Sequence, residues 1–274
     1  MALIPFLSPS AAMLSVTQDQ LYGWLTQFMW PFVRVLSLFA VAPLFGESSI
    51  PRTAKIGLAA VFAVAIAPSI PPIPVIPPGS YTGLLILAQQ VMIGIAIGYT
   101  MRIVFSAVQT AGEFVGLQMG LSFATFFDPS MGANTAVLSR LFNIVAMLIF
   151  LAIDGHLLML AAIVRTFETL PIGELTLHQN GWGVLVEWGS TIFSSGLLLA
   201  LPLIAALLTI NLALGILNRA APQLSVFSVG FPISITVGVI LLAIVLPQTP
   251  PFLEDLFRSG LEATSRVVDG FAGR

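Results

Sequence analysis

The chain has 274 residues, of which 57% are hydrophobic and only 8% are charged. A soluble domain carries about 25% charged residues, so this composition excludes a soluble fold and indicates a membrane protein with several spans. The ten basic residues are scattered and form no nucleic-acid patch. The chain has no cysteine, which excludes disulfides and thiolate metal sites, and its two histidines are too few for a histidine-rich metal site.

Apolar runs of about 20 residues predict membrane-spanning helices. Six hydrophobic segments follow one another, at residues 28–45, 56–67, 84–104, 141–153, 192–217 and 227–246. We therefore expect an all-α membrane protein. The second segment is short, the fourth is expected to extend toward residue 164, and Pro202 interrupts the fifth.

The connections between these segments differ in character. Six prolines between residues 68 and 78 predict a stiff, extended connector. A polar loop with three glutamates and a histidine is expected after the fourth segment, and residues 250–274 have the pattern of an amphipathic helix at an interface or a docking surface. Lysines and arginines favour an outside N-terminus, although those of the tail favour the opposite orientation.

Three polar side chains lie within apolar segments. Placing the charge of Arg34 in the middle of a bilayer costs at least about 2.5–3.5 kcal/mol of insertion free energy, unless the charge is paired or hydrated. Arg34 is therefore either an inter-subunit or pore-facing ion pair, or it snorkels to an interface near Trp30. Asp154 and His156 have the chemistry of a proton relay, but a structural hydrogen bond or a loop position explains them better.

Glycines at four-residue spacing predict close helix packing, because such a row forms a flat face. One row holds Gly94 and Gly98, and we expect it to face a neighbouring subunit. The turn into the last segment contains Pro222, Phe231 and Pro232, for which a rigid turn between packed subunits is sufficient.

The most unusual stretch is AGEFVGLQMGLSFATFFDP, residues 111–129, which carries polar groups and glycines between apolar segments. Irregular or polar backbone at membrane depth is tolerated only where protein buries it or it lines a cavity. Deformable apolar side chains on a glycine-rich hinge suit a plug that closes a pore, and an ordinary re-entrant packing element is the alternative. The candidate plug residues are Gly112, Glu113, Phe114, Gly116, Leu117, Met119, Gly120, Phe123, Phe126, Phe127 and Asp128.

Six stretches in order along the chain resemble the FliR family of flagellar biosynthetic proteins, called SctT in injectisomes. They are WPFVRVLSLFAVAP (30–43), IPRTAKIGLA (50–59), AGEFVGLQMGLSFATFFDP (111–129), DGHLLML (154–160), TLPIG (169–173) and INLALGILNRAAPQLSVFSVGFP (210–232). The stretch at 111–129 fits the flagellar branch better than the injectisome branch. Ser234 departs from many relatives, which have a basic residue there.

The resemblance implies an inner-membrane subunit of the flagellar type III secretion export gate, at the basal body. It implies one copy of this chain among FliP and FliQ subunits, contact with FlhB and with lipid, and unfolded flagellar proteins as cargo. It further implies a FliP-like portion at 1–187 with the plug at 111–128, a FliQ-like hairpin at 188–249 and a tail at 250–274. It also implies helices that can be kinked and raised out of the bilayer.

No nucleotide, metal, nucleic-acid or catalytic motif stands out in the sequence, so we expect no cofactor and no enzyme activity. Two other functions remain as alternatives. A small-molecule transporter would need convergent polar groups at the midplane and usually an internal repeat. A passive membrane scaffold would organise its neighbours without forming a channel.

Overall fold

The structure is a computed structural model that describes residues 18–121, 137–173, 177–220 and 230–274. Within these ranges the regular elements are helices, as expected for an all-α membrane protein. The α-helices are α1 (Gln18–Val41), α2 (Arg52–Ile66), α3 (Tyr81–Gln118), α5 (Val137–Ala152), α6 (Gly155–Thr169), α7 (Asn180–Trp188), α8 (Thr191–Ala220), α9 (Phe231–Val245) and α10 (Pro250–Phe271). Two single 3₁₀ turns, Ala67–Ser69 and Leu246–Gln248, extend α2 and α9.

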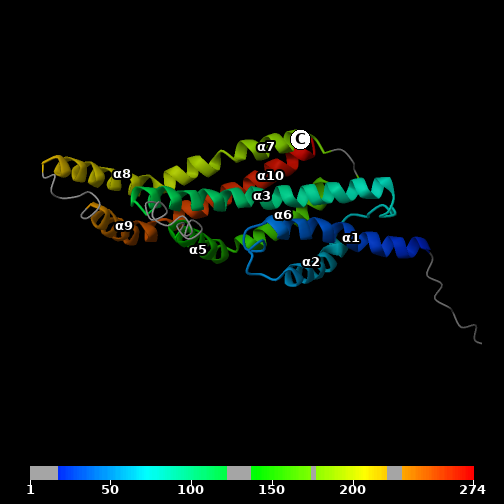
Figure 1. Ribbon diagram of the computed structural model, residues 1–274. Helices are drawn as coiled ribbons and strands as arrows, with labels where there is room; N and C mark the ends of the chain where they lie inside the picture. Colours follow the sequence, from blue (N-terminus) through cyan, green and yellow to red (C-terminus); the bar gives the residue numbers. More distant parts are fainter. Residues whose placement is uncertain (1–17, 122–136, 174–176, 221–229) are drawn as a thin grey trace, which may run out of the picture.

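Helix α3 is the axis of the fold and contacts α1, α5, α8 and α10 (Figure 1). It begins at Ser80, whose hydroxyl accepts a hydrogen bond from the Gly83 amide at 3.0 Å. Its 38 residues correspond to a length of about 57 Å, well beyond the ~30 Å hydrocarbon core of a bilayer. One helix therefore connects two regions of the molecule with different neighbours.

The N-terminal half of α3 packs on α1, and the C-terminal half packs on α5, α8 and α10. Three rings join the second region: Phe105 of α3 lies 5.5 Å from Phe150 of α5 and 5.3 Å from Phe257 of α10, measured between ring centroids. All three side chains are buried. This aromatic cluster fixes α10 against the middle of α3.

Five helices are long and apolar enough to cross a membrane: Gln20–Val41, Arg52–Ser69, Tyr81–Gln118, Asn180–Ala220 and Phe231–Gln248. The pair α5 and α6 passes the same test together but is bent by 68°. The bend lies at Asp154, which has a left-handed backbone with φ of 56°. Five spans, or six if the bent pair counts as one, agree with the predicted class of membrane protein.

Several predicted boundaries are wrong for physical reasons. The third segment does not end at residue 104, because α3 continues to Gln118 with polar residues on a single face. The polar loop predicted after the fourth segment is shorter than expected: Glu168 lies in α6 and Glu187 in α7, whereas His178 lies in the connection between the two helices. Glu174 lies outside the described residues. Pro202 leaves α8 unbroken.

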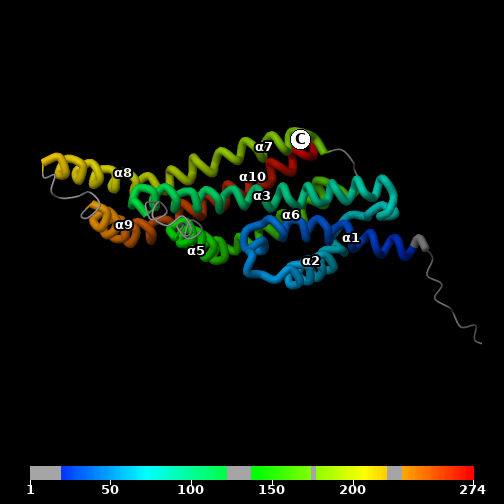
Figure 2. The backbone as a smooth tube through the Cα atoms, in the orientation of Figure 1, coloured from blue at the N-terminus to red at the C-terminus, as the bar shows by residue number. Residues whose placement is uncertain are grey.

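The predicted amphipathic tail is helix α10, and its apolar face packs inside this chain. Leu253, Phe257, Val267 and Phe271 are each at most 2% exposed. Figure 2 shows α10 beside α7 near the C-terminus, where the Phe271 and Trp182 rings are 4.9 Å apart. The tail is therefore part of the core.

Candidate functional site: the base of the predicted plug

The described part of the predicted plug is the C-terminal end of α3. The Gly120 amide donates to the Leu117 carbonyl and the Leu121 amide to the Gly116 carbonyl, both at 3.0 Å. Gly120 has φ of +80°. These two bonds with a left-handed glycine form a Schellman motif, which ends a helix and turns the chain sharply. Gly120 therefore sets the direction in which the chain leaves α3.

Two polar side chains of the α8–α9 hairpin hold residues 117–121, which we call the plug base. Asn211 of α8 donates from Nδ2 to the Gln118 carbonyl at 3.2 Å. The Ser234 hydroxyl of α9 donates to Asn211 Oδ1 at 2.9 Å. Asn211 thus uses both ends of its amide and links α3, α8 and α9 at one point.

Apolar packing supports the same junction. Met119 is 1% exposed and lies against Gly238 of α9, where an added Cβ would come within 2.6 Å of the methionine side chain. A hollow of about 300 Å³ adjoins this contact and is lined by the plug base, α8 and the start of α9, including Phe231. The hairpin therefore supports the plug base through one buried contact and one polar link.

The three glycines of this segment, Gly112, Gly116 and Gly120, have different roles. Gly112 is buried against α5, where an added Cβ would lie 2.6 Å from Ser139 Cα. Gly116 has room, with its nearest neighbouring atom at 3.9 Å. Gly120 ends the helix. The expectation that these glycines loosen a hinge from residue 112 onward is wrong, because α3 remains regular through Gln118.

The other plug candidates lie partly in α3 and partly outside the described residues. Among the described ones, Glu113 and Leu117 are exposed, and Phe114 is half-buried. Four candidates, Phe123, Phe126, Phe127 and Asp128, lie outside the described residues. The structure thus describes the base of the predicted plug.

Arg34 is fully buried in the chain rather than turned outward. Its guanidinium donates to Gln90 Oε1 at 2.7 Å, to Thr166 Oγ1 and carbonyl oxygen at 2.9 and 3.0 Å, and to the Leu170 carbonyl at 3.0 Å. The Phe167 ring lies 4.2 Å from the guanidinium carbon. The structure therefore differs from both interpretations of the sequence, an outward ion pair and snorkelling: Arg34 ties α1 to α3 and to the end of α6.

Gly94 and Gly98 also face the inside of this chain. An added Cβ at Gly94 would meet Ser37 Oγ and the Arg34 carbonyl oxygen, and one at Gly98 would lie 3.1 Å from the Leu38 carbonyl oxygen. The predicted close helix packing is present, but its partner is α1 and not a second subunit.

The remaining candidates lie at turns. Asp154 is exposed at the bend between α5 and α6, which agrees with a loop position, and His156 is half-buried at the start of α6. Phe231 and Pro232 begin α9, whereas Pro222 lies outside the described residues.

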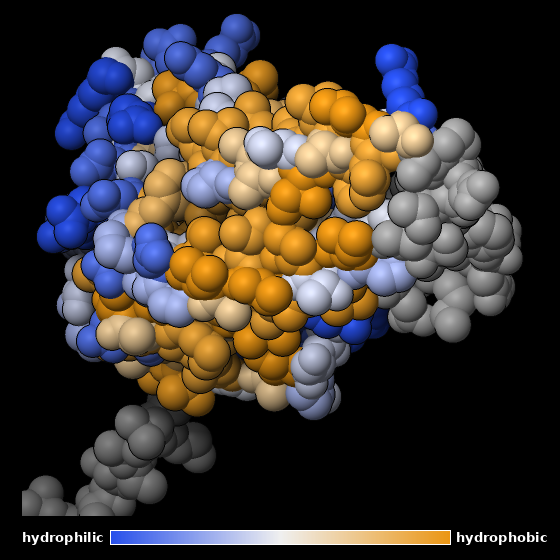
Figure 3. Space-filling view, turned by 90° about the vertical axis from the view of Figure 1, so that its left-hand side faces the viewer, coloured by the Kyte–Doolittle hydropathy of each residue, from blue (hydrophilic) through white to orange (hydrophobic). Residues whose placement is uncertain are grey.

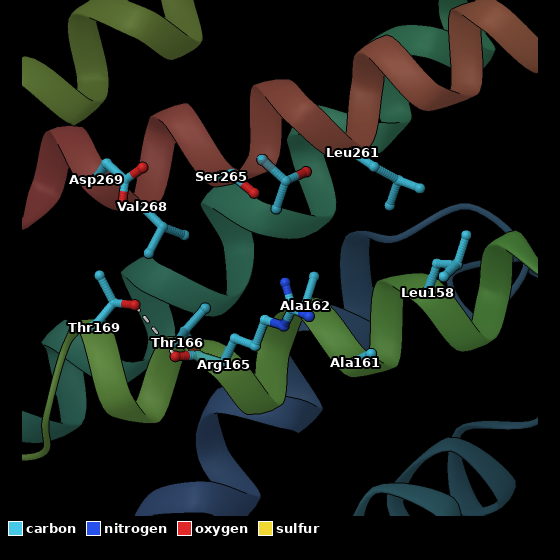
Figure 4. A pocket seen from close by; sticks show the side chains of 11 residues that line it. Leu158, Ala161, Ala162, Arg165, Thr166, Thr169, Leu261, Ser265, Val268 and Asp269 are labelled. Carbon is cyan, nitrogen blue, oxygen red and sulfur yellow. Dashed lines mark hydrogen bonds between the residues drawn. The ribbon is translucent and has the colours of Figure 1, made fainter.

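A second hollow, of about 370 Å³, separates α6 from α10 and is shown in Figure 4. Arg165 of α6 and Asp269 of α10 lie at its border, and both are exposed. In the part of the chain that the structure describes, no group of three or more His, Cys, Asp or Glu side chains could hold a metal ion.

Known proteins resemble this chain over nearly its whole length. The flagellar biosynthetic protein FliR of Escherichia coli (strain K12) is 51% identical over 245 residues, which cover 89% of this chain and 94% of that protein. The chain belongs to the FliR family. The FliR protein of Pectobacterium carotovorum is 48% identical over 256 residues, covering 93% of this chain and 98% of the relative. The FliR protein of Aquifex aeolicus is 30% identical over 251 residues, covering 90% and 96%.

Residues 25–260 also match the family described as bacterial export proteins, family 1. The family assignment made from the six sequence stretches is therefore confirmed. Membership in the FliR family, with the apolar helices above, supports a membrane-embedded component of the flagellar export apparatus.

Sequence reasoning missed Asn211 and the contact that Ser234 makes with it. The available signal was a single amide in the apolar run of α8, TINLALG, at a depth where polar side chains need partners. The partner, the Gln118 carbonyl, is 93 residues away, and no sequence pattern identifies it.

Proposed function

We propose that this FliR-family chain is a subunit of the flagellar type III export gate, that it forms and closes a channel for unfolded flagellar proteins, and that it nucleates gate assembly. It acts as a single copy among FliP and FliQ subunits, next to FlhB, in the bacterial inner membrane. It does so as a channel component and not as an enzyme. The observation that carries the proposal is the plug base, where the α8–α9 hairpin holds the end of α3 within the predicted plug.

The geometry of the plug base suits a closing element. A plug needs a rigid support, so that its apolar side chains can occlude a pore. It also needs a defined point at which the chain leaves that support. The buried Met119 and the Asn211 link supply the support. The left-handed Gly120 supplies the exit point.

The outer surfaces suit a chain that is surrounded by other helices. Large apolar side chains of α2, α8 and α9 are widely exposed, among them Val61 at 68%, Leu212 at 67% and Ile244 at 56%. Figure 3, which views the end of the molecule where α8 and α9 lie, shows a broad apolar face. Lipid and neighbouring hydrophobic subunits are the surroundings that such a surface tolerates. The proposed FliP-like portion at 1–187, the FliQ-like hairpin at 188–249 and the tail at 250–274 would divide these contacts.

The two alternatives are less well supported. A transporter needs free polar groups in its interior, but the guanidinium of Arg34 is already bonded to acceptors of this chain. A passive scaffold does not require a helix end that is fixed by a neighbouring hairpin, as the end of α3 at Gly120 is.

One experiment in cells tests the proposal. Deleting residues 122–131 retains the helix end at Gly120 and the residues that form the hydrogen bond from the Leu121 amide to the Gly116 carbonyl, so every described residue is still present in the chain. We expect the variant to copurify with its FliP and FliQ neighbours from native membranes, and the cells to leak ions while cargo is still exported. The undeleted chain at equal expression is the control. Copurification without any leak would favour a scaffold, and recovery without FliP and FliQ would contradict the gate assignment.

A further inference from the structure

A single face of α3 changes its chemistry halfway along the helix. Outward positions recur at alternating spacings of three and four residues, which keeps them on one face. In the first half this face exposes apolar side chains, with Met92, Ile95 and Tyr99 between 36% and 49% exposed. From the next position onward it exposes or half-exposes Arg102, Ser106, Gln109 and Glu113. We call these four residues the polar stripe.

Helix α5 extends the polar stripe sideways. Gln109 donates from Nε2 to Asn143 Oδ1 at 2.9 Å, and the Ser139 hydroxyl donates to the Gln109 carbonyl at 2.9 Å. Arg140, one turn before Asn143, is exposed. The hollow beside the stripe has a volume of about 270 Å³, and Glu47, Arg102, Ser106, Gln109 and Asn143 are among its lining residues.

The neighbouring side of the molecule at the same level, which is formed by α8, is apolar. Gly196 of α8 packs on the Ala107 carbonyl of α3, and Asn211 bonds the Gln118 carbonyl, so α8 runs beside the polar half of α3. Between those two contacts α8 exposes Leu198 at 59% and Leu208 at 51%. A region that had simply left the membrane would be polar on all sides. Here one side suits hydrocarbon and the other suits water.

We infer that the polar stripe and Asn143 form a wall of the water-filled conduit through which extended polypeptide passes, next to the plug base along α3. This inference rests on the proposed function and assigns residues to the path that the plug closes. The stripe lies on the same helix as the plug base and ends one turn before it, at Glu113. Glu113 was a candidate plug residue and is here assigned to the wall.

The chemistry of the stripe suits an extended chain in transit. Unfolded polypeptide presents backbone donors and acceptors at every residue, and neutral hydroxyl and amide groups exchange hydrogen bonds with them and with water. The charges nearby are of both signs, Arg102 and Arg140 against Glu47 and Glu113. A wall of this kind holds no cargo tightly, and conduction requires such weak, repeated contacts.

The test uses the absence of cysteine from the chain. Ser106→Cys is close to isosteric, and Arg102→Cys is a second stripe variant at an exposed site should the first fail to assemble. Two control cysteines face the apolar surroundings: Ile95→Cys lies on the same face of α3, and Leu198→Cys lies at the same level on α8. Each is made in the intact chain and in the chain lacking residues 122–131. Assembled gates in native membranes are then treated with a charged, membrane-impermeant thiosulfonate.

A thiol reacts as thiolate, which forms in water and not in hydrocarbon. We expect the stripe cysteines of the deleted chain to react about tenfold or more faster than both controls, and the attached group to reduce the ion leak. Stripe cysteines that react no faster than the controls, in a gate that leaks, would overturn the conduit wall while leaving the channel function in place. Fast reaction without any effect on the leak would also overturn it, and a deletion without leak would refute the proposed function itself.

Discussion

Arg34→Met is expected to destabilise the fold strongly, because methionine fills the space of the arginine stem but donates no hydrogen bond. The change leaves Gln90 Oε1, two oxygens of Thr166 and the Leu170 carbonyl without their donor. One partner remains: the Thr166 carbonyl still accepts from the Leu170 amide at 2.9 Å. Three acceptors therefore lose their only donor at about 1–3 kcal/mol each, while the desolvation cost of the buried charge is removed at the same time, so the net loss is about 3–5 kcal/mol.

The assay is thermal unfolding in mild detergent, followed by the fluorescence of the four tryptophans. At roughly 2–4 °C per kcal/mol for a chain of this size, Arg34→Met should melt roughly 6–20 °C below the unsubstituted chain. The matched control is Arg165→Met, which removes an exposed arginine from α6 and should change stability by no more than about 0.5 kcal/mol. Equal melting temperatures for the two variants would refute the account of Arg34.

Three further outcomes follow from the packing. Gly94→Ala, which places a methyl group against α1, should destabilise the chain by about 1–3 kcal/mol in the same assay. Gly57→Ala, where the added Cβ would have no atom within 4 Å, should be neutral or stabilising. A larger destabilisation by Gly57→Ala than by Gly94→Ala would contradict the α1–α3 contact. Gly120→Ala, at a left-handed position, should destabilise the chain by about 1–2 kcal/mol and increase the ion leak. Gly116→Ala, where the added Cβ has its nearest neighbouring atom at 3.9 Å, should do neither. Asn211→Ala removes the polar link to the plug base; a loss of about 1 kcal/mol should raise the leaking fraction about fivefold, and an unchanged leak would show that the link does not hold the plug.

Hydropathy predicted the existence and order of the apolar helices, because each presents enough apolar side chains to stand out in a window. It failed where a helix is polar on one face. Helix α3 was predicted to end at residue 104, since Arg102, Gln109 and Glu113 lower the mean hydropathy although the buried faces of the helix remain apolar. Helix α7 was missed for a different reason: it has only nine residues, two of which are glycines, so it is too short to stand out as a span.

The partners of the polar and small residues could not be predicted, because they lie far away in sequence. A charge inside a span indicated that Arg34 needs partners, but Thr166 is 132 residues further on. The spacing of Gly94 and Gly98 indicated close approach without indicating which helix approaches. In each case the pattern implied an interaction and tertiary structure decided that it lies within the chain. The assignment of the plug to residues 111–128 remains a prediction, of which the structure describes the base.

The central claim is that this chain closes a channel, and the conductance of the purified gate tests it most directly. The complex of this chain with its copurifying neighbours is reconstituted into a planar bilayer, once with the intact chain and once with residues 122–131 deleted. The account predicts a membrane that stays electrically tight with the intact chain and conducts steadily with the deleted one. Equal, negligible conductance from both complexes, with the intact chain shown to be present in one and the deleted chain in the other, would contradict the claim and favour a scaffold.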